Sequence, residues 1–140
     1  MDHPAPAITK EDLSQALASA PFATVYGFEI ASFGVGECSI RVPFQSALER
    51  PGGIVSGPAF MAAADVAMWL AIKTRLGLAD GSVTVEMKTN FLASAKQEDF
   101  SCTARILKCG QRLIYGVAEC LSADGKLLTH HTLTYIRHGK

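Results

Sequence analysis

Residues 57–72 read GPAFMAAADVAMWLAI, and the central element of the predicted fold follows from this segment. Every side chain from Ala59 to Ile72 is apolar except that of Asp65. The pattern predicts a long helix that runs from about Pro58 to Arg75. Because the helix is apolar on nearly every side, other elements of the chain must cover it.

The residues that flank this helix support both of its predicted ends. Proline suits the first helical turn, and Ser56 or Gly57 suits the capping position before it. Lys73 and Arg75 stand near the C-terminal end, where the helix macrodipole favours cations. Gly77 can then close the helix.

Asp65 is the residue of this stretch that points to chemistry. An ionised carboxylate buried among apolar neighbours is costly unless it is paired or hydrogen-bonded. Carboxylates held in such places are what general-base chemistry needs. The alternative is that Asp65 lies on the polar edge of an amphipathic helix and simply points to solvent.

The rest of the chain predicts one short helix and six strands. Thr9 caps the short helix, with Asp12 at its third position, and Pro21 ends it. Residues 46–56 form a loop, and residues 124–125, Asp-Gly, are a strong hairpin signal. The order predicts an α+β fold in which an antiparallel sheet wraps around the long helix. The predicted strands cover residues 26–33, 37–44, 82–92, 100–109, 112–122 and 127–137.

Composition predicts one ordinary folded domain. The chain has 140 residues, of which 49% are hydrophobic and 19% are charged, so it can build a core. The formal net charge is zero and no long charge run appears, which argues against nucleic acid as a partner. We expect an N-terminal tail and short helix over residues 1–20 and a single domain over residues 21–140.

Neither a membrane segment nor a metal site is expected. No stretch is long and apolar enough to span a bilayer, and the N-terminus lacks the apolar core of a signal peptide, so we expect a cytoplasmic protein. His130 and His131 are adjacent on a strand and therefore face opposite sides of it, which fits satisfied structural histidines. The cysteines have no metal-binding spacing and are expected to be buried free thiols. They are Cys38, Cys102, Cys109 and Cys120.

Further segments around the helix match a known family in their order along the chain. Residues 50–58 read RPGGIVSGP, residues 83–92 VTVEMKTNFL, residues 108–113 KCGQRL and residues 124–128 DGKLL. Together with the placement of Asp65, this order resembles the hotdog-fold acyl-CoA thioesterases, most closely the phenylacetate-pathway (PaaI-like) branch. The resemblance covers roughly residues 20–137. None of these motifs is specific alone, but the four segments and the placement of Asp65, five features in this order, are specific together.

The loop before the helix departs from the pattern of that branch. The branch has an Asn, then a Gly, then His-Gly-Gly, with an Asp nine positions after the His. Here Arg50 replaces the Asn, Ser56 replaces the His and Pro58 replaces the second Gly. Ser56 then either caps the helix or supplies a hydrogen bond that is weaker than the one from the His it replaces. The positions that are kept are Gly53, Gly57 and Asp65.

The resemblance implies a mechanism and an assembly. Asp65 would act as general base or nucleophile on the thioester, and the Gly57 N–H would polarise the carbonyl. Thr84 aligns with a residue that helps to hold the attacking water, although threonine is also common in strands for its β-propensity alone. In these enzymes the carboxylate and the Gly N–H come from different subunits, so the resemblance implies a homodimer or homotetramer. The substrate is an acyl-CoA, and no metal or organic cofactor is needed.

Candidate substrate-binding residues lie on the helix. Met61, Met68 and Trp69 share the face of Asp65 by i±3 and i±4 spacing and would line an apolar pocket for an acyl or aryl chain. The alternative is that these residues are ordinary core. The resemblance adds Gly53 and Pro58, from the loop before the helix, to the candidate substrate-binding residues.

Three basic residues are candidates for charged parts of the substrate. Arg50 could pair with a substrate carboxylate, a CoA phosphate or Asp65, or it could be an exposed loop residue. Lys108 and Arg112 flank a turn where the family binds CoA phosphates, but basic residues beside hairpin turns are common on surfaces.

Two other functions remain open at the level of sequence. The replaced Asn and His, together with Pro58, are consistent with a protein that binds acyl thioesters without hydrolysing them. A hydratase or dehydratase is ranked last, because such hotdog enzymes use a His that this loop lacks.

Overall fold

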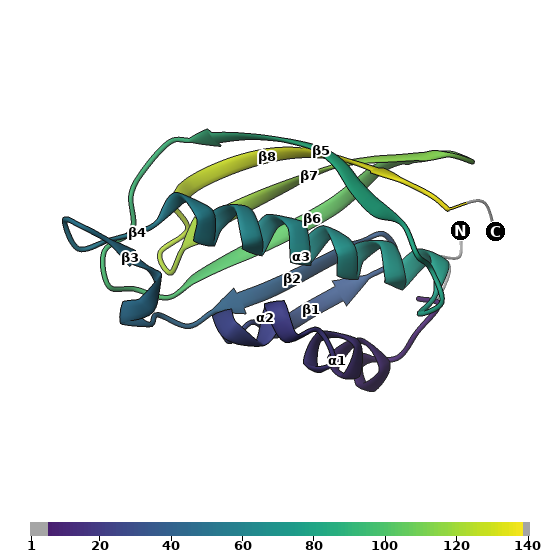
Figure 1. The fold of residues 1–140 in the computed structure, drawn as a ribbon, viewed down its shortest axis with the longest axis horizontal. Helices are drawn as coiled ribbons and strands as arrows, with labels where there is room; N and C mark the ends of the chain where they lie inside the picture. Colours follow the sequence, from purple (N-terminus) through teal and green to yellow (C-terminus); the bar gives the residue numbers. More distant parts are fainter. Residues whose placement is uncertain (1–5, 139–140) are drawn as a thin grey trace.

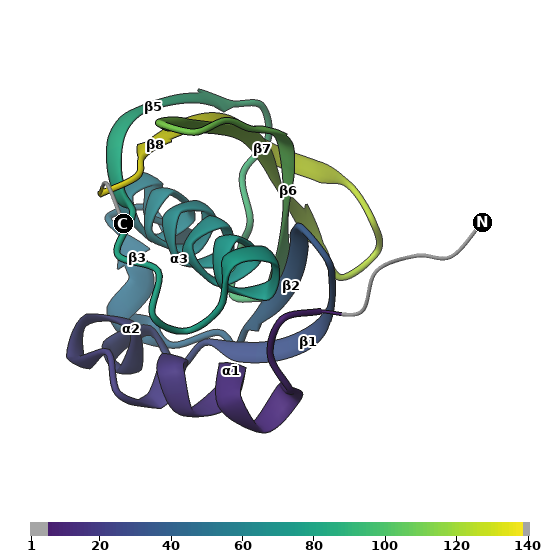
Figure 2. The same ribbon diagram turned by 90° about the vertical axis from the view of Figure 1, so that its right-hand side faces the viewer.

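A single long helix, α3 (Gly57–Leu76), lies in the concave face of a six-stranded antiparallel sheet in the computed structural model, which describes residues 6–138 (Figure 1). The strand order is β1-β2-β6-β7-β8-β5. Figure 2 shows the sheet curving around the helix. The predicted α+β arrangement is therefore confirmed. The strands are β1 (Glu29–Gly34), β2 (Glu37–Val42), β5 (Val83–Phe91), β6 (Phe100–Cys109), β7 (Leu113–Ser122) and β8 (Leu127–Ile136).

Small side chains let α3 approach the sheet closely. Most residues of the helix are buried, and many of them are alanines. Opposite the helix, β7 carries Gly116, where an added Cβ would collide with the Met68 side chain and with the Arg105 carbonyl oxygen. Glycine is therefore required at this point of contact between helix and sheet, because any side chain there would overpack the core.

Both ends of α3 fall where the sequence predicts. Ser56 occupies the capping position with an extended backbone, but its side chain makes no capping hydrogen bond. Pro58 stands in the first turn, where its missing N–H costs nothing. Gly77 ends the helix with φ 96°, and its N–H donates to the Lys73 carbonyl oxygen at 2.9 Å.

The N-terminal segment forms two helices where the sequence predicts one. In α1 (Lys10–Ala18), Thr9 and Asp12 form the predicted capping box, with hydrogen bonds of 3.1 and 3.2 Å. Pro21 does not end this helix. It begins a second one, α2 (Pro21–Tyr26), because proline is well suited to a first helical turn. The first strand consequently starts at Glu29, three residues later than predicted.

The predicted loop over residues 46–56 has internal structure. It contains a short 3₁₀ helix, η1 (Ser46–Leu48), and a small hairpin of β3 (Glu49–Arg50) and β4 (Ile54–Val55). Gly52 and Gly53 form its turn with φ angles of 105° and 77°, which other residues adopt rarely. Hairpins this short leave no periodic pattern in the sequence.

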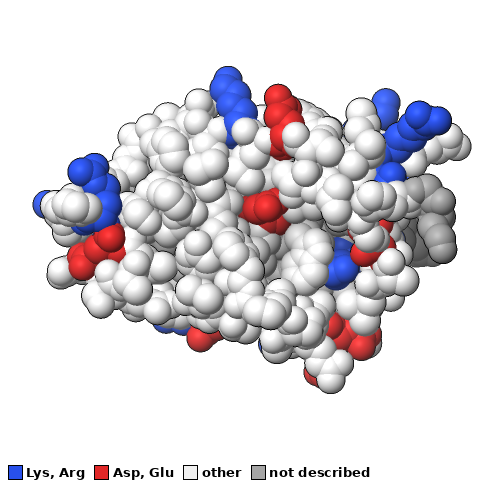
Figure 3. Space-filling view, in the orientation of Figure 1, with Lys and Arg blue, Asp and Glu red and all other residues white. Residues whose placement is uncertain are grey.

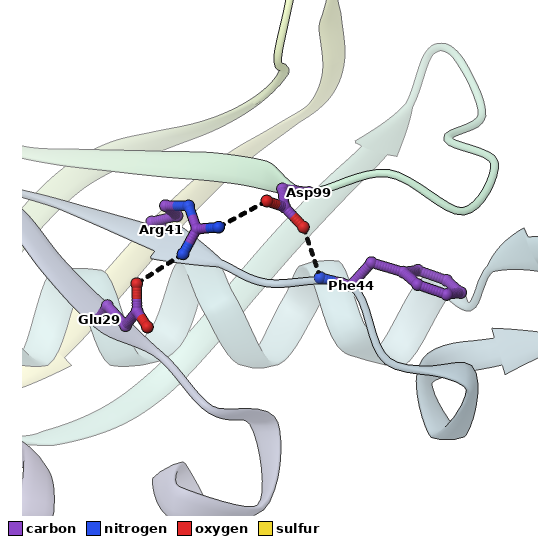
Figure 4. Close-up of polar contacts among 4 residues, drawn as sticks. All are labelled: Glu29, Arg41, Phe44 and Asp99. Carbon is purple, nitrogen blue, oxygen red and sulfur yellow. Dashed lines mark hydrogen bonds and ion pairs between the residues drawn. The ribbon is translucent and has the colours of Figure 1, made fainter.

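A charged network ties the first two strands to the segment before β6 (Figure 4). Arg41 binds Glu29 and Asp99, each at 2.6 Å. Asp99 also accepts the backbone N–H of Phe44 at 2.7 Å. The Phe44 N–H and the Arg41 guanidinium lower the pKa of Asp99. These contacts join three segments that are distant in sequence.

The interior holds free thiols and a histidine whose ring nitrogens both have partners. Cys38, Cys102 and Cys120 are buried, and burial raises the pKa of Cys38 to about 12. His131 is fully buried, with its ring nitrogens 2.8 Å from the Thr89 hydroxyl and 2.7 Å from the Thr129 hydroxyl. Within residues 6–138, no cluster of His, Cys, Asp or Glu is arranged to hold a metal ion. Nor does any helix in that range have the length and apolar character needed to cross a bilayer.

Candidate functional site

Asp65 lies in the middle of α3 and is partly exposed. The Thr84 hydroxyl donates to its Oδ1 at 2.7 Å, and the Tyr135 hydroxyl lies 2.6 Å from the same oxygen. The Tyr135 hydroxyl is also 2.9 Å from the Asp65 backbone carbonyl oxygen. Within the described residues, Oδ2 has no hydrogen-bond partner. One carboxylate oxygen is thus held in place while the other remains available.

Tyr135 was not predicted from sequence. It pairs with Thr84 across β5 and β8, which brings both hydroxyls to the same point on the helix. Burial and the neighbouring Asp65 carboxylate raise the pKa of the Tyr135 hydroxyl, so it stays protonated and can donate. Alternation along β8, in which Leu133 and Tyr135 both face inward, is a signal that could have indicated it.

A cavity of about 440 Å³ lies beside the carboxylate. Trp69 lines it, as predicted, and the cavity is closed on one side by Phe22 and neighbouring residues of α2. Met68 does not contribute, which corrects the prediction for this residue. Met68 is buried against Gly116 in the core, and Met61 is 39% exposed and does not line the cavity. Spacing along α3 alone did not reveal which residues the curved sheet covers.

A second cavity, of about 400 Å³, lies at the N-terminus of α3 and is lined by Arg50, Gly57 and Phe91 among others. Within the described residues, the Gly57 N–H donates no hydrogen bond, as expected for the first N–H of a helix. The Ala59 N–H donates to the Ser56 carbonyl oxygen at 3.1 Å. An added Cβ at Gly57 would lie 3.2 Å from the ring of Phe91, so only glycine fits without displacing this ring.

The two cavities are separate within one chain. Gly57 and Asp65 are eight residues apart on the same helix, which corresponds to about 12 Å along its axis. The structure brings Asp65, Thr84 and Trp69 together, and it brings Arg50 to Gly57. The remaining predicted loop residues, Gly53, Ser56 and Pro58, adjoin the second cavity in sequence but do not line it.

Lys108 and Arg112 are exposed at the turn between β6 and β7. The sheet register places this turn at the same end of the molecule as Thr84, because Leu113 pairs with Ile136 and Ile136 pairs with Val83. Neither basic residue lines the cavity beside Asp65.

Charge is sparse over the middle of one face of the molecule. In the orientation of Figure 1, Figure 3 shows mostly uncharged atoms there, interrupted by a small acidic area near the centre and a basic area to its lower right, while the other charged side chains lie toward the rim. A surface of this kind is suited to an apolar ligand or to a second copy of the chain.

Comparison with known proteins agrees with this geometry. Residues 52–129 match the family model described as the thioesterase superfamily. A relative from Thermoplasma volcanium, provisionally named an esterase, is 31% identical over 117 residues, which cover 84% of this chain and 86% of the relative. The match to the family model spans more than half of the chain.

Solved structures share the same architecture. A protein from a Silicibacter species, provisionally named a thioesterase, is 29% identical with a TM-score of 0.85, and the match covers 95% of this chain and 94% of that one. The phenylacetic acid degradation protein PaaI from Thermus thermophilus is 22% identical with a TM-score of 0.76, and covers 84% of this chain and 99% of its own. At that identity the likeness to PaaI concerns the fold alone. The sheet, the central helix and the matched residues together mean that this chain is a hotdog-fold member of the thioesterase superfamily.

Proposed function

We propose that this protein hydrolyses an acyl-CoA to a free acid and CoA, with Asp65 as general base or nucleophile. The observation that carries the proposal is the carboxylate itself. Thr84 and Tyr135 hold its Oδ1, and Oδ2 has no hydrogen-bond partner among residues 6–138, beside a largely apolar cavity. As a base, Asp65 takes a proton from water as the water attacks the thioester carbonyl; the C–S bond then breaks, and the proton passes to the departing CoA thiolate. As a nucleophile, its carboxylate attacks the carbonyl carbon and expels CoA thiolate to form a mixed anhydride, which water then cleaves to the free acid and the Asp65 carboxylate.

The Gly57 N–H is the proposed donor to the oxyanion. It stands at the N-terminus of α3, where the helix dipole also favours negative charge. Pro58 has no N–H and the Ala59 N–H donates to the Ser56 carbonyl oxygen, so among the first three residues of α3 Gly57 supplies the N–H without a partner within residues 6–138. A single well-placed donor of this kind contributes about 3 kcal/mol to the transition state. In this scheme Ser56 contributes through its backbone, which occupies the capping position of α3.

A homodimer would complete this site. β5 is an edge strand with Thr84 near one end and Phe91, which packs on Gly57, at the other. If β5 paired antiparallel with the β5 of a second copy, with the two strands centred on each other, the Thr84 end of one strand would lie beside the Phe91 end of the other. Asp65 would then face the partner's Gly57. The exposed apolar side chains of Val85 and Phe91 support such pairing, and two dimers can form a tetramer.

The proposed substrate follows from what surrounds Asp65. The apolar wall of α2 and Trp69 suits an acyl or aryl chain. Lys108 and Arg112, on the rim at the same end of the sheet, are proposed to contact the phosphates of CoA. Arg50 is proposed to contact substrate in the cavity beside Gly57. The proposed location is the cytoplasm.

The test is release of free thiol from a panel of short, medium-length and aryl acyl-CoAs. We expect Asp65→Asn to lower kcat by about 10²–10⁴, the usual contribution of a general base. Glu11→Gln, the same change of carboxylate to amide on the exposed surface of α1, is the matched control and should retain full activity. Undiminished turnover by Asp65→Asn would refute the mechanism. Binding of acyl-CoAs without any turnover would instead identify a non-catalytic binding protein.

A further inference from the structure

A third cavity adjoins the one beside Asp65. It has a volume of about 630 Å³ and lies between α1 and the C-terminal half of α3. Trp69 is a lining residue of both cavities. Polar groups of α1 and its C-terminal cap, including Gln15 and Ser19, line one side, and Lys73 lines the other. No part of the proposed mechanism uses this cavity.

Lys73 is an unusual residue for such a position. The residue is only 6% exposed, and its Nζ donates hydrogen bonds of 3.3 Å to the backbone carbonyl oxygens of Leu78 and of Asp80. Nζ also lies 4.8 Å from the centre of the Trp69 ring. Within residues 6–138, no carboxylate lies within ion-pair distance of Nζ. A buried ammonium without a counter-ion is costly, so it is a ready binding partner for an anion.

Neither Asp12 nor Asp80 forms an ion pair with Lys73. Asp12 lines the same cavity, but its side chain accepts the backbone N–H of Thr9. The Asp80 carboxylate binds the backbone and hydroxyl of Ser82. Burial lowers the pKa of Lys73, and the charge of Asp80 offsets this only in part. An anionic ligand would supply the charge that the described residues do not.

The position of Lys73 relative to Asp65 indicates which anion it would bind. Lys73 lies two helical turns beyond Asp65, and Trp69 lies between them. An acyl chain whose thioester stands at Asp65 would run past Trp69 and end near Nζ. We propose that Lys73 binds a carboxylate at the far end of the acyl group, which makes monothioesters of dicarboxylic acids the preferred substrates. This inference rests on the proposed thioesterase function.

The experiment compares two series of substrates that differ only at the far end of the chain. Adipoyl-, suberoyl- and sebacoyl-CoA carry a terminal carboxylate, and hexanoyl-, octanoyl- and decanoyl-CoA carry a methyl group. We expect kcat/KM for the best carboxylate-ended chain to exceed that of its methyl-ended counterpart by about ten- to hundredfold, as for a hydrogen bond between charged groups. Equal values in the wild type would refute the inference and leave the thioesterase function intact.

Variants of Lys73 separate recognition from structural support. Lys73→Met should abolish the preference for carboxylate-ended chains and leave methyl-ended chains nearly unchanged, while Lys73→Arg should retain part of it. Arg75→Met removes an exposed cation from the same helical turn and should change neither series. If Lys73→Met slowed both series equally, Lys73 would only be holding the loop after α3, and the inference would be wrong.

The phosphates of CoA are the other anions that could reach Lys73. Thioesters of N-acetylcysteamine lack these phosphates and distinguish the two sources. If the effect of Lys73→Met persists on carboxylate-ended N-acetylcysteamine thioesters, the acyl carboxylate is the ligand. If the effect occurs on every CoA thioester and on none of the N-acetylcysteamine thioesters, Lys73 binds CoA and the inference is overturned.

Binding can be measured without turnover. Trp69 is the only tryptophan of the chain and lines both cavities, so its fluorescence reports on ligands bound in either one. We expect the ω-carboxy analogue of octanamide to bind the wild type at least tenfold more tightly than octanamide itself, and Lys73→Met to remove the difference. Equal affinities in the wild type would count against the subsite even if no thioester were hydrolysed.

Discussion

Tyr135 and Thr84 hold one oxygen of Asp65 from two neighbouring strands, and each hydroxyl contributes to the orientation of the carboxylate. Removing a hydrogen bond to a charged group typically costs about 1.5–3 kcal/mol. We therefore expect Tyr135→Phe to lower kcat by about tenfold or more, because the Thr84 hydroxyl alone then orients the Asp65 carboxylate. Steady-state kinetics on the best substrate of the panel will measure this.

A matched variant shows whether the effect is local to the site. Tyr115 is exposed on β7, so Tyr115→Phe should leave kcat unchanged. The melting temperatures of both variants should be compared with that of the wild type. If Tyr135→Phe lost activity only in proportion to its loss of folded protein, the hydroxyl would have no role in positioning Asp65.

At the scale of elements, the contact between α3 and β7 determines how closely the sheet can wrap the helix. Gly116→Ala would force its Cβ against the Met68 side chain and the Arg105 carbonyl oxygen. We expect a loss of about 1–3 kcal/mol in the free energy of unfolding, as is typical of overpacking. Gly81→Ala is the control, since an added Cβ there meets nothing within 4 Å. Urea unfolding of both variants will show whether Gly116 alone is intolerant.

The network of Arg41, Glu29 and Asp99 has a pH dependence of known sign (Figure 4). The pKa of Asp99 is lowered from 3.8 in the folded state, so the folded state favours its ionised form. The stabilisation is therefore complete well above pH 3.8 and is lost as the pH falls through the lowered pKa. We expect Asp99→Asn to lower the melting temperature at neutral pH, and the difference from wild type to shrink below pH 3.8.

Glu98→Gln serves as the control for this network. Glu98 is adjacent in sequence, but among the described residues it takes part in none of these contacts. The Glu98→Gln variant should show little change in melting temperature at neutral pH. A constant difference between Asp99→Asn and wild type across the acidic range would contradict the role of the ionised carboxylate.

At the scale of the whole molecule, the exposed edge of β5 is the proposed dimer interface. Val85 is 54% exposed in the single chain, and Val85→Lys would place a charge within the paired edges. We expect this variant to sediment as a monomer and to lose activity, because Asp65 and the partner's Gly57 would no longer meet. Val25→Lys, at a 68% exposed position on α2, should remain oligomeric. A monomeric wild type with full activity would refute the shared site.

Local patterns in the sequence were sufficient for the central helix, for its ends at Ser56 and Gly77, and for the strands around it. They were sufficient because hydrophobic periodicity, proline and glycine act on residues close together in the chain. The same patterns singled out Asp65 as the polar residue of an apolar helix. Helix α2 was missed because Pro21 is equally consistent with the end of one helix and the start of the next.

Which side chains contact Asp65 depends on how the strands and helices pack in three dimensions. Thr84 and Tyr135 are far apart in sequence and become neighbours through the register of β5 and β8, which no local pattern encodes. Met68 shares a helical face with Asp65 by spacing, yet the curved sheet covers it, whereas Trp69 stays at the cavity. The burial of Lys73 likewise depends on α1 packing beside α3. Long-range contacts of this kind depend on how whole elements pack, so they appear only when the fold is assembled.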